Sequence, residues 1–212
     1  TMHTFGITNH LDAVMSLCLG PCDVSVREMV TAYTAFANKG LRVDPIYVTK
    51  ICDNNGNVIS EFSPQYTEVL SESAYFKMVN ILQNVINAGT GNRLRRPPYN
   101  ITAPMGGKTG TTNYNSDGWF MAFTPKLVSG AWVGGEERYI HFNSMAQGQG
   151  ASMALPIYGL FIKKVYADKT LPYSQNDKFP EPPEGFEPCY KEDIVGDVVE
   201  EQPVEAVENA FE

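Results

Sequence analysis

The sequence predicts an α+β fold in which an antiparallel sheet is flanked by helices. Two stretches, at residues 25–37 and 71–86, carry apolar side chains at helical spacing behind an N-capping serine. Several β-branched and aromatic runs are joined by short, turn-rich links, which favour antiparallel neighbours over helical crossovers. Strands and helices do not alternate one by one, so a parallel βαβ sheet is not expected.

The first helix begins at Ser25, which forms a capping box with Glu28, and ends at Gly40. Its apolar face consists of Met29, Ala32, Tyr33, Phe36 and Ala37. A β-hairpin is predicted next, because strand-like runs at residues 45–51 and 58–62 flank an Asn-Gly turn.

The second helix begins at Ser71 and ends before Gly89. Its apolar face consists of Tyr75, Met78, Val79, Leu82, Val85 and Ile86. A basic, proline-broken loop follows at residues 89–100. Beyond it we predict three strands, at residues 105–111, 119–123 and 128–133. A glycine- and methionine-rich loop at residues 144–156 and a closing helix at residues 157–166 follow.

The charge of the chain is concentrated at its C-terminal end. Of the 24 acidic and 16 basic residues, residues 181–212 hold 11 acidic residues and only Lys191, so the first 180 residues are nearly neutral. We therefore expect a folded unit at residues 1–170 and a Pro-rich, then acidic, disordered tail at residues 171–212. Neither part has a basic face, so nucleic acid is not expected as a partner, and no run of about 18 apolar residues predicts a membrane span.

The cysteines do not predict a metal site. Cys18 and Cys22 are close in the sequence, but neither a second cysteine pair nor a neighbouring histidine completes a set of four ligands. We expect unpaired, buried thiols, with a Cys18–Cys22 disulfide as the alternative.

The segment "GGKTGTT", residues 106–112, allows two interpretations. A phosphate-binding loop needs a glycine five residues before Gly107, where Thr102 stands, and a helix directly after Thr109. The residues that follow, "GTTNYNSDG", are unsuited to begin a helix, so this interpretation is rejected. Small residues followed by β-branched threonines instead predict a strand that another chain could approach closely.

On such a strand, Lys108 and Gly110 point to one face while Thr109 and Thr111 point to the other. Because Gly110 has no side chain, a bound peptide could lie along the strand and exchange backbone hydrogen bonds with it. Lys108 would then offer a cation to the carboxylate of that peptide. An exposed lysine in a tight turn is the alternative for so short a motif.

The wider context of this triplet resembles a known family. The segments "GGKTGTT", "DGWFMAFTP", "LVSGAWVGGEE" and "SMALPIYGLFIKKVY", together with the upstream "AYTAFANKG", resemble penicillin-binding transpeptidases of class A, the bifunctional peptidoglycan synthases. The resemblance covers roughly residues 15–168 in order. It implies a penicillin-binding transpeptidase or serine β-lactamase-like fold, with residues 1–170 as the C-terminal portion of the transpeptidase domain.

The resemblance also implies an activity, a D,D-transpeptidase of cell-wall synthesis. A serine would attack the D-Ala-D-Ala stem peptide of peptidoglycan, release D-Ala and pass the acyl group to an acceptor amine on a second stem. β-Lactam antibiotics would acylate the same serine.

The resemblance assigns a role to each residue of the triplet and to Thr111. Lys108 polarises the site and holds the substrate carboxylate, and Thr109 binds that carboxylate. Gly110 keeps the strand edge open, and Thr111 gives a backbone N–H to the oxyanion hole. Asp117 and Trp119 match family positions too, but a turn acid and a core aromatic residue are the preferred interpretations. No metal or organic cofactor is implied.

Two family motifs are absent from the 212 residues. No serine is followed by lysine three positions later, and the one Ser-x-Asn match, at residues 174–176, follows the triplet and is interpreted as chance. We therefore expect the chain to be inactive without the N-terminal half of the same domain. The parent is expected at the outer face of the cytoplasmic membrane, anchored by an N-terminal helix and carrying a glycosyltransferase. The alternatives are a D,D-carboxypeptidase or β-lactamase-like hydrolase, and a non-catalytic binding module.

Overall fold

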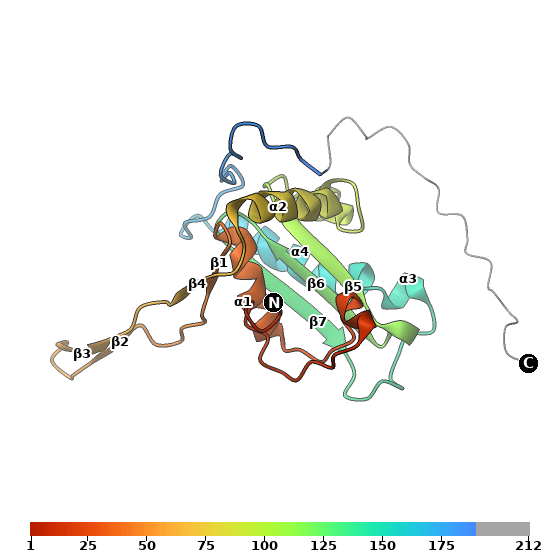
Figure 1. Cartoon of the computed structure of the whole chain (residues 1–212), viewed down its shortest axis with the longest axis horizontal. Helices are drawn as coiled ribbons and strands as arrows, with labels where there is room; N and C mark the ends of the chain where they lie inside the picture. Colours follow the sequence, from red (N-terminus) through yellow and green to blue (C-terminus); the bar gives the residue numbers. More distant parts are fainter. Residues whose placement is uncertain (190–212) are drawn as a thin grey trace, which may run out of the picture.

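A computed structural model describes residues 1–189 and shows a three-stranded sheet with helices on both faces (Figure 1). The strands β5 (Gly106–Thr111), β6 (Asp117–Phe123) and β7 (Val128–Gly134) are antiparallel in the order β5-β6-β7. Among the described residues, β5 therefore has a partner strand on one side only. The predicted α+β class, the antiparallel pairing and all three strands of this sheet are confirmed.

Helices α1 (Val26–Ala37) and α2 (Glu72–Asn87) pack on one face of the sheet, and α4 (Gly150–Ala167) packs on the other (Figure 1). Phe123 points toward α1 and α2, whereas its neighbour Ala122 points toward α4, as alternation along a strand requires. The sheet is thus the middle layer of three.

Each face of the sheet has its own apolar core. On the α4 side, Phe120 packs edge-to-face against Tyr158 with ring centroids 5.1 Å apart. On the opposite side, Phe123 meets Phe36 of α1 at 5.8 Å. Ile86, at the end of α2, belongs to the α4-side core, so α2 reaches around the β5 margin of the sheet.

Both predicted helix starts are confirmed. The Ser25 hydroxyl accepts a hydrogen bond from the Glu28 backbone N–H, while the Glu28 carboxylate accepts from Ser25. The other carboxylate oxygen of Glu28 accepts bonds from Thr8 and Asn9. Hydrogen bonds from Ser25 and Thr8 hold the pKa of this carboxyl well below its usual range, although burial opposes them. Glu28 therefore attaches the N-terminal segment to α1. In α2, the Ser71 hydroxyl accepts from Ala74.

The closing helix is longer than the sequence predicts. Most of the glycine- and methionine-rich segment is helical, first as α3 (Met145–Gly148) and then as the opening turns of α4. Pro156 lies inside α4 and contributes no N–H there. Met153 lies against Gly118 of β6 and Ala154 belongs to the apolar core on this face, so these turns are stabilised by packing on the sheet.

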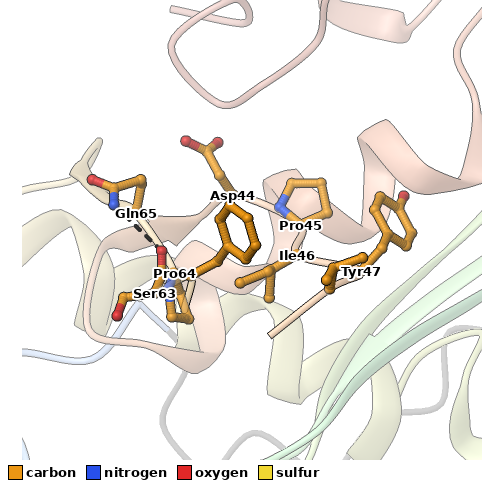
Figure 2. A pocket seen from close by; sticks show the side chains of 9 residues that line it. Asp44, Pro45, Ile46, Tyr47, Ser63, Pro64 and Gln65 are labelled. Atoms are coloured by element: carbon orange, nitrogen blue, oxygen red, sulfur yellow. Dashed lines mark hydrogen bonds between the residues drawn. The ribbon is translucent and has the colours of Figure 1, made fainter. Parts of the chain in front are cut away.

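Residues 44–65 form an arm that projects from the body (Figure 1). The short strands β1 (Leu41–Val43) and β4 (Tyr66–Glu68), which were not predicted, pair at its base. The predicted hairpin forms its tip, from β2 (Lys50–Cys52) and β3 (Val58–Glu61), but residues 45–49, the first part of the predicted strand, are not in a strand. The arm contains a concavity of about 370 Å³ that is lined mainly by apolar side chains. Figure 2 shows Ile46 and Tyr47 among them.

Residues 171–189 pack against the body, so the expectation of disorder from residue 171 does not hold for this part. Phe179 meets Phe123 at 5.6 Å between ring centroids, and Phe186 meets Phe76 at 5.8 Å. Asp177 pairs with Lys126 at 2.7 Å. Through these partly buried rings, the proline-rich segment packs against the apolar core of α1 and α2. The acidic residues from 190 onward lie outside the described residues.

Of the four cysteines, all unpaired, Cys18, Cys52 and Cys189 are exposed and Cys22 is half-buried, so the expectation of buried thiols is wrong. Cys18 lies in the 3₁₀ helix Met15–Leu19, which has no buried residue. No helix within residues 1–189 is both long and apolar enough to cross a bilayer.

Candidate active site on the edge strand

The Lys-Thr-Gly triplet lies in the second half of β5, as the strand interpretation predicts. Lys108 pairs with Met121 and Gly110 with Trp119 in the register of β5 and β6. No helix follows the triplet directly, so the phosphate-loop interpretation is excluded by the fold. The Lys108 side chain is exposed, and its ammonium donates to the Thr109 carbonyl at 2.8 Å. A cation and a strand with one open side are therefore available at this margin.

The glycines of β5 have a different explanation from the predicted one. A Cβ at Gly106 would lie 2.5 Å from the Phe123 ring, and one at Gly107 would lie 2.7 Å from the Met121 carbonyl oxygen. Both positions are buried by the chain itself, so their small size serves packing against β6 and α2. At Gly110 a Cβ would press on Trp119 at 3.1 Å. Of these three glycines, Gly110 alone is partly exposed.

The two threonines of β5 each contact a segment distant in the sequence. The Thr109 hydroxyl lies 2.8 Å from the Thr90 hydroxyl, in the loop that follows α2. The Thr111 hydroxyl accepts a hydrogen bond from the Gly150 N–H at 3.0 Å. A Cβ at Gly150 would collide with the Gly110 and Trp119 carbonyl oxygens, so the start of α4 lies directly against the strand backbone. These contacts fix the position of the candidate residues.

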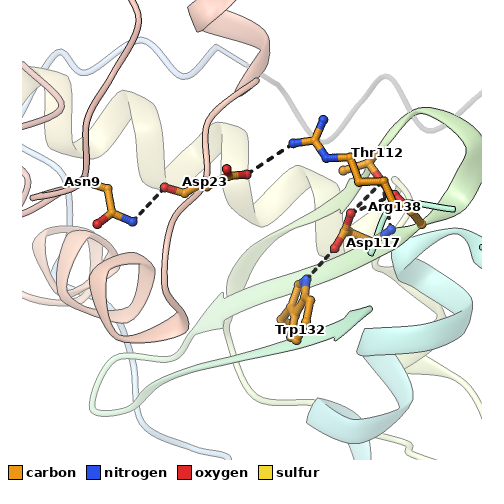
Figure 3. A network of polar contacts seen from close by, with 7 residues as sticks. Asn9, Asp23, Thr112, Asp117, Trp132 and Arg138 are labelled. Atoms are coloured by element: carbon orange, nitrogen blue, oxygen red, sulfur yellow. Dashed lines mark hydrogen bonds and ion pairs between the residues drawn. The ribbon is translucent and has the colours of Figure 1, made fainter. Parts of the chain in front are cut away.

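Asp117 organises the turn that follows β5. Figure 3 shows its carboxylate between the indole of Trp132, whose Nε1 donates at 3.0 Å, and the hydroxyl of Thr112. The Ser116 hydroxyl donates to the same carboxylate at 2.9 Å. Trp119, half-buried, packs beside Trp132 with ring centroids 6.5 Å apart. These contacts agree with the interpretation of Asp117 as a turn acid, whereas Trp119, interpreted from the sequence as a core aromatic residue, is only half-buried.

Comparison with known proteins identifies the family. Residues 6–134 match the model of the penicillin-binding protein transpeptidase domain. The chain belongs to this family. The family resemblance drawn from the sequence is therefore confirmed.

The relatives of this transpeptidase domain come from diverse bacteria. Penicillin-binding protein 1A of Aquifex aeolicus is 35% identical over 178 residues, covering 84% of this chain and 23% of the relative. Penicillin-binding protein 2D of Bacillus subtilis is 36% identical over 138 residues, covering 63% of this chain and 20% of the relative. The chain thus spans about a quarter of the length of these relatives.

Solved structures share the fold at lower sequence identity. Penicillin-binding protein 1A from Haemophilus influenzae superposes with a TM-score of 0.72 at 22% identity, covering 86% of this chain and 32% of that one. The penicillin-binding protein PonA1 from Mycobacterium tuberculosis gives a TM-score of 0.66 at 21% identity, covering 86% of this chain and 51% of that one.

Sequence reasoning did not find Thr90 or Gly150 as neighbours of the triplet. They lie 19 and 39 positions from the threonines that they contact, and no local pattern relates residues at such separations. The sequence alone places Thr90 only in a basic, proline-broken loop and Gly150 only in a glycine- and methionine-rich loop. Among residues 1–189, no three acidic, histidine or cysteine side chains are grouped so that they could hold a metal ion.

Proposed function

We propose that this chain supplies the lysine-bearing strand of a peptidoglycan D,D-transpeptidase. The supporting observation is a Lys-Thr-Gly triplet with an exposed lysine, on a strand that has a partner strand on one side only among the described residues, within a chain of the transpeptidase family. A stem peptide ending in D-Ala-D-Ala would lie along β5 and exchange backbone hydrogen bonds with it. Residues Lys108, Thr109, Gly110 and Thr111 would form this side of the site.

Each residue has a physical role in the proposal. Lys108 would leave the Thr109 carbonyl and face the terminal carboxylate of the peptide. Two opposite charges about 4 Å apart attract by about 4 kcal/mol at an effective dielectric of ~20, and desolvation removes part of this gain. Thr109 would donate its hydroxyl to the same carboxylate. The Thr111 N–H would donate to the oxyanion and thereby lower the activation free energy by about 3 kcal/mol.

The nucleophilic serine is proposed to come from another part of the domain, because no serine of these 212 residues has a lysine three positions later. Its hydroxyl oxygen would form an ester with the penultimate D-Ala carbonyl, and the terminal D-Ala would leave as the free amino acid. An acceptor stem amine would then displace the serine and form the cross-link. β-Lactam antibiotics would acylate the same serine, and PonA1, a neighbour in fold, has been crystallised with penicillin V. We propose that this reaction takes place at the outer face of the cytoplasmic membrane. The relatives' chains are several times longer than the matched part, which leaves room in the parent protein for a membrane anchor and a glycosyltransferase.

The test is the rate of acylation of the complete protein by a fluorescent penicillin. Lys108→Ala should lower this rate by about 100-fold, the loss typical of a removed electrostatic contact to the reacting group. Lys77, on α2, is also exposed, so Lys77→Ala is the matched control and should leave the rate unchanged. Equal rates for Lys108→Ala and wild type would refute the assigned role.

Two further measurements on the penicillin adduct test where the nucleophile lies and distinguish a transpeptidase from a hydrolase. Mass spectrometry should locate the penicillin adduct outside these 212 residues, and a labelled serine among them would show that the nucleophile lies here. An adduct that persists for hours indicates a transpeptidase, whereas release within seconds indicates a hydrolase.

A further inference from the structure

The loop after α2 carries one side chain to the proposed substrate strand. Gly89 donates its N–H to the Asn84 carbonyl at 3.0 Å, and Gly91 donates to the Val85 carbonyl at 3.0 Å. The residues on both sides of Thr90 are thereby hydrogen-bonded to the backbone near the end of α2. Thr90 itself is exposed, with its hydroxyl 2.8 Å from that of Thr109.

Ile86 holds this loop and β5 together. Its side chain is fully buried, and its Cδ1 lies 2.6 Å from the Cβ position of Gly91 and 3.0 Å from that of Gly107. A larger residue at Gly91 would push the loop away from α2, and the same methyl group contacts the strand one residue before Lys108. The place of Thr90 beside Thr109 is therefore determined by buried packing rather than by the hydroxyl contact alone.

In a hydrogen bond between two hydroxyl groups either group can donate, and a ligand bound to one of them can determine which group does so. Each threonine hydroxyl has one proton to donate and two lone pairs to accept with, whereas an ionised carboxylate only accepts. If Thr109 donates to a carboxylate, its single proton is used, and the 2.8 Å contact can form only if Thr90 donates to Thr109. A hydroxyl that accepts one hydrogen bond becomes a stronger donor in the next.

We propose that Thr90 is a positioning residue that donates to Thr109 and thereby holds the Thr109 proton toward the carboxylate of the substrate. This inference rests on the proposed function, because it assumes that Thr109 binds the carboxylate. Thr90 does not touch the reacting atoms. It acts through Thr109, so its effect depends on whether the ligand carries a negative charge at that place.

The test compares two ligands on the complete protein: benzylpenicillin, which carries a carboxylate, and benzylpenicillin methyl ester, which does not. Thr90→Val should lower the acylation rate constant for benzylpenicillin by about fivefold, as expected for one neutral hydrogen bond. It should leave the rate for the ester unchanged. Thr90→Ser, which retains the hydroxyl, should restore the rate for benzylpenicillin to within about twofold of wild type.

Two further variants separate this role from a structural one. Thr90→Val combined with Thr109→Val should be no slower than Thr109→Val alone, since Thr90 acts only through Thr109. Thr102→Val is the matched control, because Thr102 is also exposed and its hydroxyl bonds a distant side chain, that of Gln175, at 2.9 Å. This control should leave the rate for both ligands unchanged.

Several results would overturn the inference. Equal slowing of both ligands by Thr90→Val would show a purely structural role, and unchanged rates for both would show that Thr90 has no role in acylation. Additive losses in the double variant would show that Thr90 acts independently of Thr109. If Lys108→Ala and Thr109→Val slow acylation while Thr90→Val does not, only this inference fails. If the wild-type protein is not acylated at all, the proposed function fails with it.

Discussion

The chain builds two antiparallel β structures from similar residues, and they differ in what covers them. In the sheet of β5, β6 and β7, Phe120 and Phe123 are fully buried between helices. In the arm, Tyr47 is 77% exposed and Ile59 is 69% exposed, although both belong to runs that predict strands equally well. Aromatic and β-branched residues favour an extended backbone in both places, but their side chains are buried only where helices pack against the strands.

The two structures are consequently stabilised by different interactions. The tip of the arm depends on local turn chemistry. The Asp53 carboxylate accepts from the N–H groups of Asn55 and Asn57, and Gly56 adopts a left-handed conformation with φ of 86°. The sheet depends on packing against α1, α2 and α4. Mutations should therefore affect the stability of the whole body in one case and of a local hairpin in the other.

The largest difference is expected between two phenylalanines. Phe123→Ala should lower the free energy of unfolding by about 4 kcal/mol, because it leaves a cavity where Phe36 and Phe179 meet it. Phe62→Ala, in the arm and 45% exposed, should cost less than about 1 kcal/mol. Urea unfolding of the protein measures both. Equal losses would mean that the arm is packed as tightly as the sheet.

Replacing a carboxylate by an amide should likewise cost more stability in the body than in the arm. Glu28→Gln should destabilise the protein by about 3 kcal/mol, because the amide cannot satisfy the donors that surround the buried carboxylate. Asp53→Asn, on the exposed turn of the arm, should leave the global unfolding midpoint unchanged.

The pH dependence of stability tests the charge on Glu28. Its pKa is lower in the folded than in the unfolded protein, so its contribution is fully present above the unfolded value of about 4.3. This contribution is lost as the pH falls from there toward the folded pKa. The unfolding free energy of wild type should therefore decrease more steeply below about pH 4.3 than that of Glu28→Gln. Parallel curves for the two proteins would contradict the ionised state.

A smaller, local effect is expected at the turn of the arm. Gly56→Ala places a side chain in a left-handed conformation, which costs about 1 kcal/mol although the surroundings are open. Amide hydrogen exchange at Ile51 and Ser60, which pair across the hairpin, should become about fivefold faster. Exchange in β6 should not change. Faster exchange in both would show that the arm and the sheet unfold together.

The smallest effect is expected at the surface of the arm. Ile59→Thr keeps β-branching and removes apolar contacts of a side chain that is 69% exposed. The free energy of unfolding should change by less than about 0.5 kcal/mol. A larger loss in urea unfolding would indicate that Ile59 is covered by another part of the protein in solution.

Local patterns predicted the elements that depend on local interactions. The capping box of Ser25 and Glu28 located the start of α1, and Ser71 located the start of α2. The composition of "GGKTGTT" was sufficient to place Lys108 on a strand rather than before a helix. These predictions succeeded because caps, turns and strand alternation involve residues within a few positions of one another.

Elements stabilised by distant residues were missed or misjudged. The opening turns of α4 lie between Gly150 and Pro156, which suggested a loop, and they are stabilised by packing on β6. The ordering of residues 171–189 depends on Phe179 and Phe186, whose partners lie far back in the sequence. The glycines before Lys108 suggested an approach by a ligand, whereas the structure shows that Phe123 and Met121 require them.

By itself, the sequence determined the α+β class, the two capped helices, the strand that carries Lys108 and the family. Only the tertiary structure decided which strands are buried, what fills the space beside the glycines and which side chain stands next to Thr109. The physical reason is that caps and alternation are short-range properties of the backbone. Burial and the Thr90–Thr109 contact arise only when segments far apart in the chain pack together.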